Sequence, residues 1–241
     1  MKKYIPNTLT CCNLISGCAA TFYGFCGDAQ VALLWIIIGA TFDFFDGMSA
    51  RLLGVSSSIG KELDSLADDI TFGFAPAALV FSELSVMPYP SKLEPIVDFI
   101  PFVAFVMAAF SAIRLAKFNL DERQTSSFIG VPTPANALFW GSLVAAHQAM
   151  LESATWAMPA VIAGVLLCSW LLVCELPMFA LKFKHWGWKG NEVRYGFMLL
   201  SVACIAAFGF VGGFWIVIAL YFLISCGLAV LHRKDKEKVA A

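Results

Sequence analysis

The sequence contains little charge. Lys, Arg, Asp and Glu together make up 14% of its 241 residues, whereas hydrophobic residues make up 60%. A soluble domain is closer to one quarter charged and one half apolar. With a mean hydropathy of +0.79, the chain is expected to be a polytopic membrane protein without a sizeable soluble domain. Its formal net charge of −1 lacks the positive excess of a nucleic-acid-binding protein and argues against that class.

The eight cysteines lack the pattern of a metal site or a disulfide framework. They form no C-x-x-C pair, and no group of them has the spacing of zinc ligands. Most lie in apolar segments, where cysteine packs as a small hydrophobic residue. We therefore expect free thiols.

Long apolar segments dominate the sequence. A helix needs about 17–25 predominantly apolar residues to cross a bilayer. Eight segments are predicted to do so: residues 9–26, 29–50, 60–82, 96–116, 133–151, 156–180, 195–209 and 211–231. Gly209 and the following Gly212–Gly213 pair predict a tight turn between the last two. The predicted fold is an all-α membrane helical bundle of about eight transmembrane helices, forming a single domain over residues 1–241.

The basic residues agree with an even number of spans. Both termini then lie on one side of the membrane, together with 15 of the 16 Lys and Arg residues, and only Lys92 lies opposite. Basic residues concentrate on the cytoplasmic side of membrane proteins. We therefore predict cytoplasmic termini and a location in the inner (cytoplasmic) membrane.

Four carboxylates interrupt the second and third apolar segments. Asp43 and Asp46 precede a short link that contains Gly54, and Asp64 and Asp68 follow this link. Each pair has helical spacing, so the two pairs are predicted to face each other on consecutive antiparallel helices, near the cytoplasmic membrane surface. Ionised carboxylates near hydrocarbon are costly, and they are functional by default.

Clustered carboxylates suit divalent cations, because the cations relieve the repulsion between the negative charges. Gly47, Ala50 and Gly60 lack side-chain bulk on the same helix faces, and Arg51 offers a planar guanidinium that suits phosphate. These residues predict a metal-dependent phosphoryl-transfer site that faces the cytoplasm. Buried ion pairs are the structural alternative, but the motif contains too few basic residues for them.

The spacing D-x2-D-G-x2-A-R-x8-G-x3-D-x3-D, over residues 43–68, resembles the signature of the CDP-alcohol phosphotransferases, and all its defining positions are present. The resemblance implies a membrane enzyme with a six-helix core, here with two more helices, that joins a CDP-linked lipid to an alcohol and releases CMP. It also implies a homodimer and two divalent cations, Mg²⁺ or Mn²⁺. The implied metal ligands are Asp43, Asp46, Asp64 and Asp68, with Asp68 as the candidate general base. The implied CDP-binding residues are Gly47, Ala50, Arg51, Gly60, Pro6, Asn7 and Thr10.

Further segments resemble the phosphatidylserine synthase branch of this family. They are Ile5–Asn13, Asp64–Ala77, Arg114–Asn119 and Phe128–Ala135, and they extend the resemblance over residues 3–137. Ser65 and Asp69 stand where phosphatidylglycerophosphate synthases tend to have proline and lysine. The branch implies transfer of a phosphatidyl group from CDP-diacylglycerol to L-serine, a step of phospholipid biosynthesis. Glycerol 3-phosphate is the alternative acceptor.

A site for L-serine needs a cation for the carboxylate and an acceptor for the ammonium group. Arg114 and Lys117 lie one turn apart, and either can hold the carboxylate, while Asn119 can accept from the ammonium group. Ordinary cytoplasmic loop charge is the alternative explanation for the two cations. The roles of Asp69 and Glu175 stay open.

Three other interpretations stay open. The segment around Asn7 either lines the cytidine end of the site or is a helix start capped by Asn7 or Thr8. Lys182 and Lys184 either contact lipid phosphates or belong to a solvated basic loop. A cation transporter is a different class of function that intramembrane acids permit, although here the acids cluster at one end of two helices rather than along a path.

Overall fold

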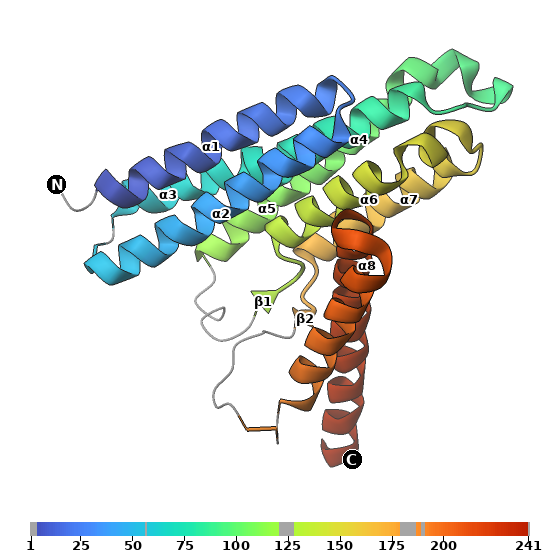
Figure 1. Cartoon of the computed structure of the whole chain (residues 1–241). Coiled ribbons are helices and arrows are strands. Elements are labelled where there is room, and N and C mark those ends of the chain that lie inside the picture. Colours follow the sequence, from blue (N-terminus) through green and yellow to red (C-terminus); the bar gives the residue numbers. More distant parts are fainter. Residues whose placement is uncertain (1–3, 56, 121–127, 179–186, 189–190, 241) are drawn as a thin grey trace.

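A computed structural model describes residues 4–55, 57–120, 128–178, 187–188 and 191–240 of the chain. Helices make up nearly all of this part (Figure 1). They are α1 (Tyr4–Phe25), α2 (Ala29–Leu53), α3 (Ser58–Asp68), the π-helix η1 (Asp69–Phe74), α4 (Ala75–Val86), the 3-10 helix η2 (Ser91–Ala104), α5 (Phe105–Leu120), α6 (Thr133–Ser153), α7 (Ala157–Val173) and α8 (Glu192–Ala240). The strands β1 (Phe128–Ile129) and β2 (Pro177–Met178) pair antiparallel. The all-α prediction is confirmed for the described residues.

The turn between α2 and α3 brings the two acidic helices together. α2 ends at Gly54, which has a φ of 62° and donates its backbone N–H to the carbonyls of Ala50 and Arg51. Glycine adopts this left-handed conformation without a steric penalty. Ser57 then caps α3, because its Oγ accepts the backbone N–H of Gly60 at 3.0 Å. The chain therefore reverses within a few residues.

α3, η1 and α4 form one continuous rod, Ser58–Val86. The π-helix in its middle begins directly after Asp68. A proline inside a continuing helix clashes with the carbonyl one turn earlier, and Pro76 stands at the start of α4, directly after the π-turn. Such turns are frequent at functional sites, and here the turn carries Asp69 and Thr71.

Small and polar residues let α1 approach its neighbours closely. The buried face of α1 consists of Pro6, Thr10, Asn13, Ser16, Gly17, Ala20 and Gly24. A Cβ on Gly17 would lie 2.3 Å from Oγ1 of Thr71, and a Cβ on Gly39 of α2 would lie 2.5 Å from Cγ2 of Thr71. Thr71 therefore fills a narrow space where α1, α2 and η1 meet.

The main apolar core lies toward the end of the bundle away from the acidic motif. Trp140 of α6 is buried at its centre with Leu79, Met107 and Val165. A Cβ on Gly164 of α7 would lie 3.0 Å from the Trp140 ring, so this glycine lets α7 pack against the indole. This core holds α4, α6 and α7 together and supports the helices that carry the acids.

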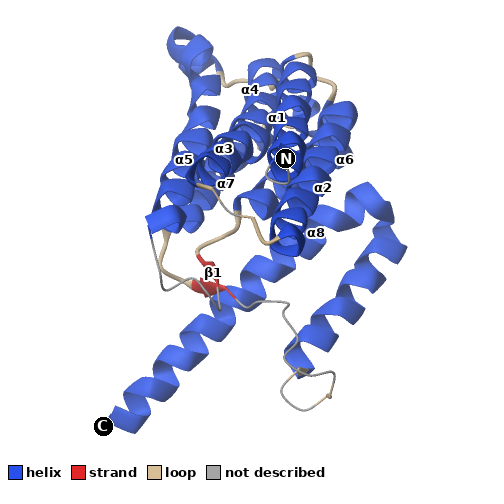
Figure 2. Ribbon diagram, turned by 90° about the vertical axis from the view of Figure 1, so that its left-hand side faces the viewer, coloured by secondary structure: helices blue, strands red, loops and turns tan. Residues whose placement is uncertain are grey.

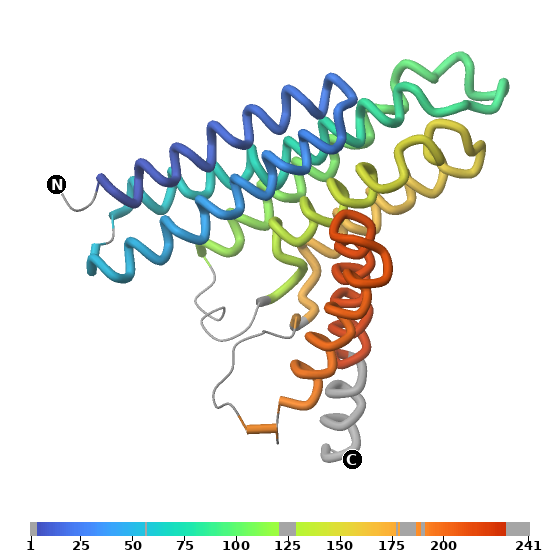
Figure 3. The backbone as a smooth tube through the Cα atoms, in the orientation of Figure 1, coloured from blue at the N-terminus to red at the C-terminus, as the bar shows by residue number. Residues whose placement is uncertain are grey.

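Gly209 divides α8 into two arms. Its backbone is non-helical, with φ 75° and ψ 171°, and a Cβ on Gly213 would lie 2.7 Å from Cα of Ile205. The expected turn is therefore present, and it depends on glycine for its conformation and for the close approach of the arms. The arms run across the direction of the other helices (Figures 1 and 3), and they diverge from the turn in the second view (Figure 2).

Four stretches of the described chain are long and apolar enough to cross a membrane. They are Ala29–Leu53, Ser58–Val86, Ser91–Leu120 and Glu192–Ala229, and α7 is a shorter apolar helix. The chain is thus a membrane protein, whereas eight spans and cytoplasmic termini remain predictions.

One boundary expected from the sequence is wrong. α7 ends at Val173, so the exposed Glu175 lies beyond the helix rather than inside a span. Lys182 and Lys184, for which the sequence left open either lipid contact or a solvated basic loop, lie outside the described residues.

Candidate active site

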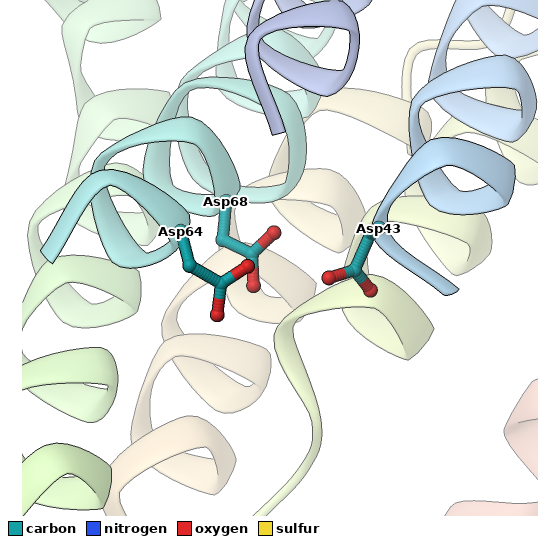
Figure 4. Close-up of side chains that lie close together, drawn as sticks. All are labelled: Asp43, Asp64 and Asp68. Carbon is teal, nitrogen blue, oxygen red and sulfur yellow. The ribbon is translucent and has the colours of Figure 1, made fainter. Parts of the chain in front are cut away.

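Three aspartates from two helices converge. Asp43 projects from α2, while Asp64 and Asp68 project from α3 toward it (Figure 4). Each of the three offers a carboxylate oxygen, and these oxygens all lie within 4.8 Å of one another. Oδ1 of Asp64 is buried and has no hydrogen-bond partner among the described residues. An oxygen-only set with an unsatisfied buried oxygen is a donor set that suits a divalent cation.

Asp46, the fourth carboxylate of the motif, is held by α1. Its side chain is 5% exposed, and its Oδ2 accepts a hydrogen bond of 2.6 Å from Oγ1 of Thr10. Asp46 and Asp64 line the same cavity. Asp46 therefore belongs to the same charged cluster, although its oxygens lie outside the group of three. Thr10, expected at the CDP site, contacts a carboxylate here.

Asn13 of α1 orients Asp68. Its Nδ2 donates to Oδ1 of Asp68 at 3.0 Å. Oγ1 of Thr71 in turn donates to the backbone carbonyl of Asn13 at 3.1 Å. A carboxylate whose one oxygen is hydrogen-bonded keeps a defined direction for the other. Neither Asn13 nor Thr71 was among the expected site residues. The sequence signals for them are weak: Asn13 is a polar residue in an apolar helix, and Thr71 is a polar residue that follows the acidic motif.

A cavity of about 490 Å³ lies beside the carboxylates. It is lined by Pro6, Asn7, Thr10, Asp46, Gly47, Ala50, Val55, Ser57, Ser58, Gly60, Lys61 and Asp64. The lining includes all the expected CDP-binding residues except Arg51. The guanidinium of Arg51 extends over Gly47, since a Cβ there would lie 3.7 Å from Nη1 of Arg51. Ser57, Ser58 and Lys61 are additional polar lining residues that the motif did not identify.

Gly60 leaves space where α1 and α3 meet in this cavity. A Cβ at this position would lie 3.2 Å from Oδ1 of Asn7 and 3.0 Å from Oγ of Ser57. Asn7 lies within α1, and this helix begins at Tyr4. The structure therefore places Asn7 inside the helix and in the cavity lining rather than at the helix cap.

The three residues expected to bind serine occupy different environments. Arg114 of α5 is buried, with only 6% of its side chain exposed. Lys117, one turn later, is exposed. Asn119 belongs to a connection between α3 and α5 in which its Nδ2 donates to Oγ of Ser65 at 2.7 Å. Nζ of Lys61 donates to the backbone carbonyl of Asn119 at 2.8 Å.

Asp69 points toward α5 rather than into the cluster of three. A Cβ on Gly73 would lie 2.8 Å from Oδ1 of Asp69 and 2.9 Å from Cβ of Ser111. Oδ1 of Asp69 and Oγ of Ser111 are both buried, and neither has a hydrogen-bond partner within the described part of the chain. Gly73 thus makes room for a carboxylate between η1 and α5.

The arrangement joins clustered carboxylates to a polar cavity lined by small residues. The carboxylates can hold a cation, and the cavity can admit a phosphate-bearing ligand. These are the components of phosphoryl transfer assisted by a metal ion.

The chain is similar in sequence to enzymes that carry out phosphatidyl transfer. The CDP-diacylglycerol–serine O-phosphatidyltransferase of Bacillus subtilis (strain 168) is 38% identical over 133 residues, which cover 55% of this chain and 70% of that protein. The protein of the same name from Mycobacterium leprae is 29% identical over 188 residues, 73% of this chain and 58% of that protein. The one from Saccharomyces cerevisiae is 37% identical over 114 residues, 44% of this chain and 38% of that protein.

The family model for CDP-alcohol phosphatidyltransferases matches residues 3–176, most of the chain. The matched region contains all four motif aspartates, the residues that line the cavity, and Arg114. Because the match and the geometry of the site agree, the chain is a member of the CDP-alcohol phosphatidyltransferase family.

Proposed function

We propose that this chain transfers the phosphatidyl group of CDP-diacylglycerol to L-serine, forming phosphatidylserine and releasing CMP. The observation that carries the proposal is the convergence of Asp43, Asp64 and Asp68 beside a polar cavity. The names of the relatives supply the choice of serine.

The cavity would hold the CDP moiety. Pro6, Asn7 and Thr10 at its α1 side are proposed to line the cytidine end. Gly47, Ala50 and Gly60 would let the diphosphate approach the helix backbones, and Arg51 would contact its oxygens through a planar guanidinium. The acyl chains would remain in the membrane.

Two divalent cations, Mg²⁺ or Mn²⁺, are proposed to bind at Asp43, Asp46, Asp64 and Asp68. The donor set fits, since three oxygens lie within 4.8 Å of one another and Oδ1 of Asp64 has no other partner in the described part of the chain. When bound, such cations stabilise negative charge that develops on a diphosphate. Thr10 would hold Asp46 in place through its hydrogen bond.

Asp68 is proposed as the general base. Asn13 holds its Oδ1, so the other oxygen can take the proton of the serine hydroxyl. The serine oxygen then forms a bond to the phosphatidyl phosphorus. The bond between this phosphorus and the oxygen of the CMP phosphate breaks, and CMP leaves with the electron pair of that bond.

The acceptor would be bound by residues of α5. Arg114 or Lys117 would pair with the carboxylate of serine, and Asn119 would accept from its ammonium group. The burial of Arg114 favours Arg114 over Lys117. Desolvation strengthens a charge-assisted hydrogen bond, and Lys117 is exposed.

The proposal also covers the membrane location, the orientation and the oligomeric state of the enzyme. It would work as a single domain in the cytoplasmic membrane, with eight spans, cytoplasmic termini and an active site that faces the cytoplasm, and it would form a homodimer. Labelling of Ser57→Cys from either side of sealed vesicles, in a chain whose eight native cysteines are replaced by serine, tests the orientation. Cross-linking in native membranes tests the dimer.

An acceptor panel tests the reaction. CMP release from CDP-diacylglycerol is measured with L-serine, glycerol 3-phosphate and other alcohols on one preparation, with Mg²⁺ or Mn²⁺. We expect serine to be preferred and Asp68→Asn to abolish turnover. Preference for glycerol 3-phosphate would overturn serine as the acceptor. Turnover of Asp68→Asn at the level of the unmodified enzyme would overturn Asp68 as the base.

A further inference from the structure

The first turn of α6 contains a buried amide whose hydrogen-bonding groups are unsatisfied. Asn136 is 0% exposed, and neither its Oδ1 nor its Nδ2 has a hydrogen-bond partner among the described residues. Thr133, one turn earlier on the same face, is also buried, and its Oγ1 has no partner there either. A buried amide without hydrogen bonds is costly, so a polar ligand is one reason for asparagine to stand here.

The packing of α6 places its first turn near the aspartate cluster. Ala137 packs with Phe72 of η1 and Ile36 of α2 in one buried cluster. Further along α6, a Cβ on Gly141 would lie 3.0 Å from Cδ1 of Leu33 of α2, so α6 runs antiparallel to α2. Earlier residues of α6 therefore lie toward the end of α2 that carries the acidic motif. In Figure 4 the yellow-green ribbon of α6 begins beside the three carboxylates.

Asn136 faces the interior of the bundle, toward α5. One turn later, Trp140 lies in the main core together with Met107 of α5. Ser111 lies one turn after Met107, and it is buried as well. α5 ends beside α3, so it runs toward the acidic motif while α6 runs away from it. Ser111 and Asn136 therefore lie between the main core and the aspartates.

Other unsatisfied polar groups lie between the same helices. Within the described ranges, Oγ of Ser111 has no hydrogen-bond partner, and neither has Oδ1 of Asp69, which lies close to it at Gly73. Nε of Arg114, one turn after Ser111 on the same face of α5, is likewise buried without a partner in this part of the chain. Donors, acceptors and a buried cation thus line the helices around η1. This mixture suits a small ligand that carries charged groups of both signs.

We propose that Asn136 is an acceptor-binding residue that recognises the α-amino-acid group of serine. Its Nδ2 donates to the carboxylate, which Arg114 also binds, and its Oδ1 accepts from the ammonium group. The positive end of the α6 helix dipole favours the carboxylate at this place. The proposal rests on the proposed function, because it takes serine as the acceptor.

The test uses Asn136→Leu in the full chain, because leucine has a similar branched shape and no polar atoms. At saturating CDP-diacylglycerol we expect the KM for serine to rise about ten-fold or more, since hydrogen bonds to two charged groups are lost. The KM for CDP-diacylglycerol should stay within about two-fold. The Tm measured without serine should not fall, because the substitution removes an unsatisfied buried amide.

Ser142→Ala is the matched control, because this serine of α6 is also buried but its hydroxyl donates to the Leu138 carbonyl of its own helix. Its kinetic constants should equal those of the unmodified chain. A lower Tm for Asn136→Leu, with a parallel loss of affinity for both substrates, would reveal a structural amide and overturn the proposal. An unchanged KM for serine would overturn it too.

A second variant keeps the test decisive if leucine prevents folding. Asn136→Asp preserves the side-chain shape but replaces the donor Nδ2 with an oxygen, which opposes the serine carboxylate. We expect the KM for serine to rise about ten-fold or more here as well. A folded Asn136→Asp chain with the KM of the unmodified chain would contradict the assignment.

The outcomes separate this proposal from the proposed function. If the unmodified chain does not use serine as an acceptor, the proposed function is wrong and the assignment of Asn136 falls with it. If the chain uses serine and the substitutions leave its KM unchanged, only the assignment of Asn136 is wrong.

Discussion

Asn13 and Asp68 lie 55 positions apart in the sequence, yet Nδ2 of Asn13 donates to Oδ1 of Asp68 at 3.0 Å. This hydrogen bond links α1 to the helix that carries half of the acidic motif. It joins a neutral amide to the carboxylate proposed as the general base. The first helix therefore contributes directly to the geometry of the active site.

Loss of this hydrogen bond should slow the reaction. For Asn13→Ala we expect kcat to fall about ten-fold or more, because a hydrogen bond to a charged group contributes about 1.5–3 kcal/mol. CMP release at saturating substrates measures the effect. Thr8→Ala is the control, since Thr8 is exposed and its hydroxyl donates to the Tyr4 carbonyl within α1. Equal rates for both variants would show that Asn13 does not orient Asp68.

Removal of the metal should stop turnover, and substitution of an aspartate of the cluster should weaken metal binding. A chelator should abolish CMP release, and Mg²⁺ or Mn²⁺ should restore it. Asp64→Asn keeps the side-chain shape but removes a charge, so we expect the Mn²⁺ concentration for half-maximal binding to rise at least about ten-fold. Direct Mn²⁺ binding measures this independently of activity. The control is Glu62→Gln, an exposed carboxylate on the same helix, and a similar loss there would contradict a specific site.

The close approach of α1 to η1 should make Gly17 intolerant of a side chain. A Cβ would lie 2.3 Å from Oγ1 and 2.8 Å from Cα of Thr71, so the helices must move apart. We expect Gly17→Ala to destabilise the protein by about 1–3 kcal/mol, seen as a lower Tm in detergent. Gly227→Ala is the control, since nothing lies within 4 Å of its Cβ position, and an unaltered Tm for Gly17→Ala would refute the tight contact.

Arg114 and Lys117 should respond differently to substitution. Arg114→Lys keeps the charge but loses the planar fork at a buried site, so the KM for serine should rise about ten-fold. Lys117→Ala removes an exposed charge and should change this KM by less than about two-fold. Steady-state kinetics with serine varied measure both. The reverse ranking would assign the carboxylate to Lys117.

Much of the candidate site follows from local spacing. Asp43 and Asp46 share one helix face, as do Asp64 and Asp68, because a helix returns to the same side every three to four residues. A glycine-containing link between the two helices makes them antiparallel neighbours. The spacing of the aspartates and the short link are therefore enough to predict that the carboxylates converge.

Long-range partners could not be found in this way. The hydrogen bond from Thr10 to Asp46 spans 36 positions, and the one from Asn119 to Ser65 spans 54. Polar residues on a membrane helix show that some partner is needed, but they do not identify it. The end of α7 at Val173 could not be predicted either, because the apolar composition continues past the residue where the helix stops.

The sequence by itself determined the helical class, the membrane setting and the pairing of acidic residues, since each depends on composition or on periodicity within a few turns. Only the tertiary structure decided that Asn13 orients Asp68, and that Arg114 is buried while Lys117 is exposed. The physical reason is that helical spacing defines a face, whereas the packing of distant helices decides what that face meets.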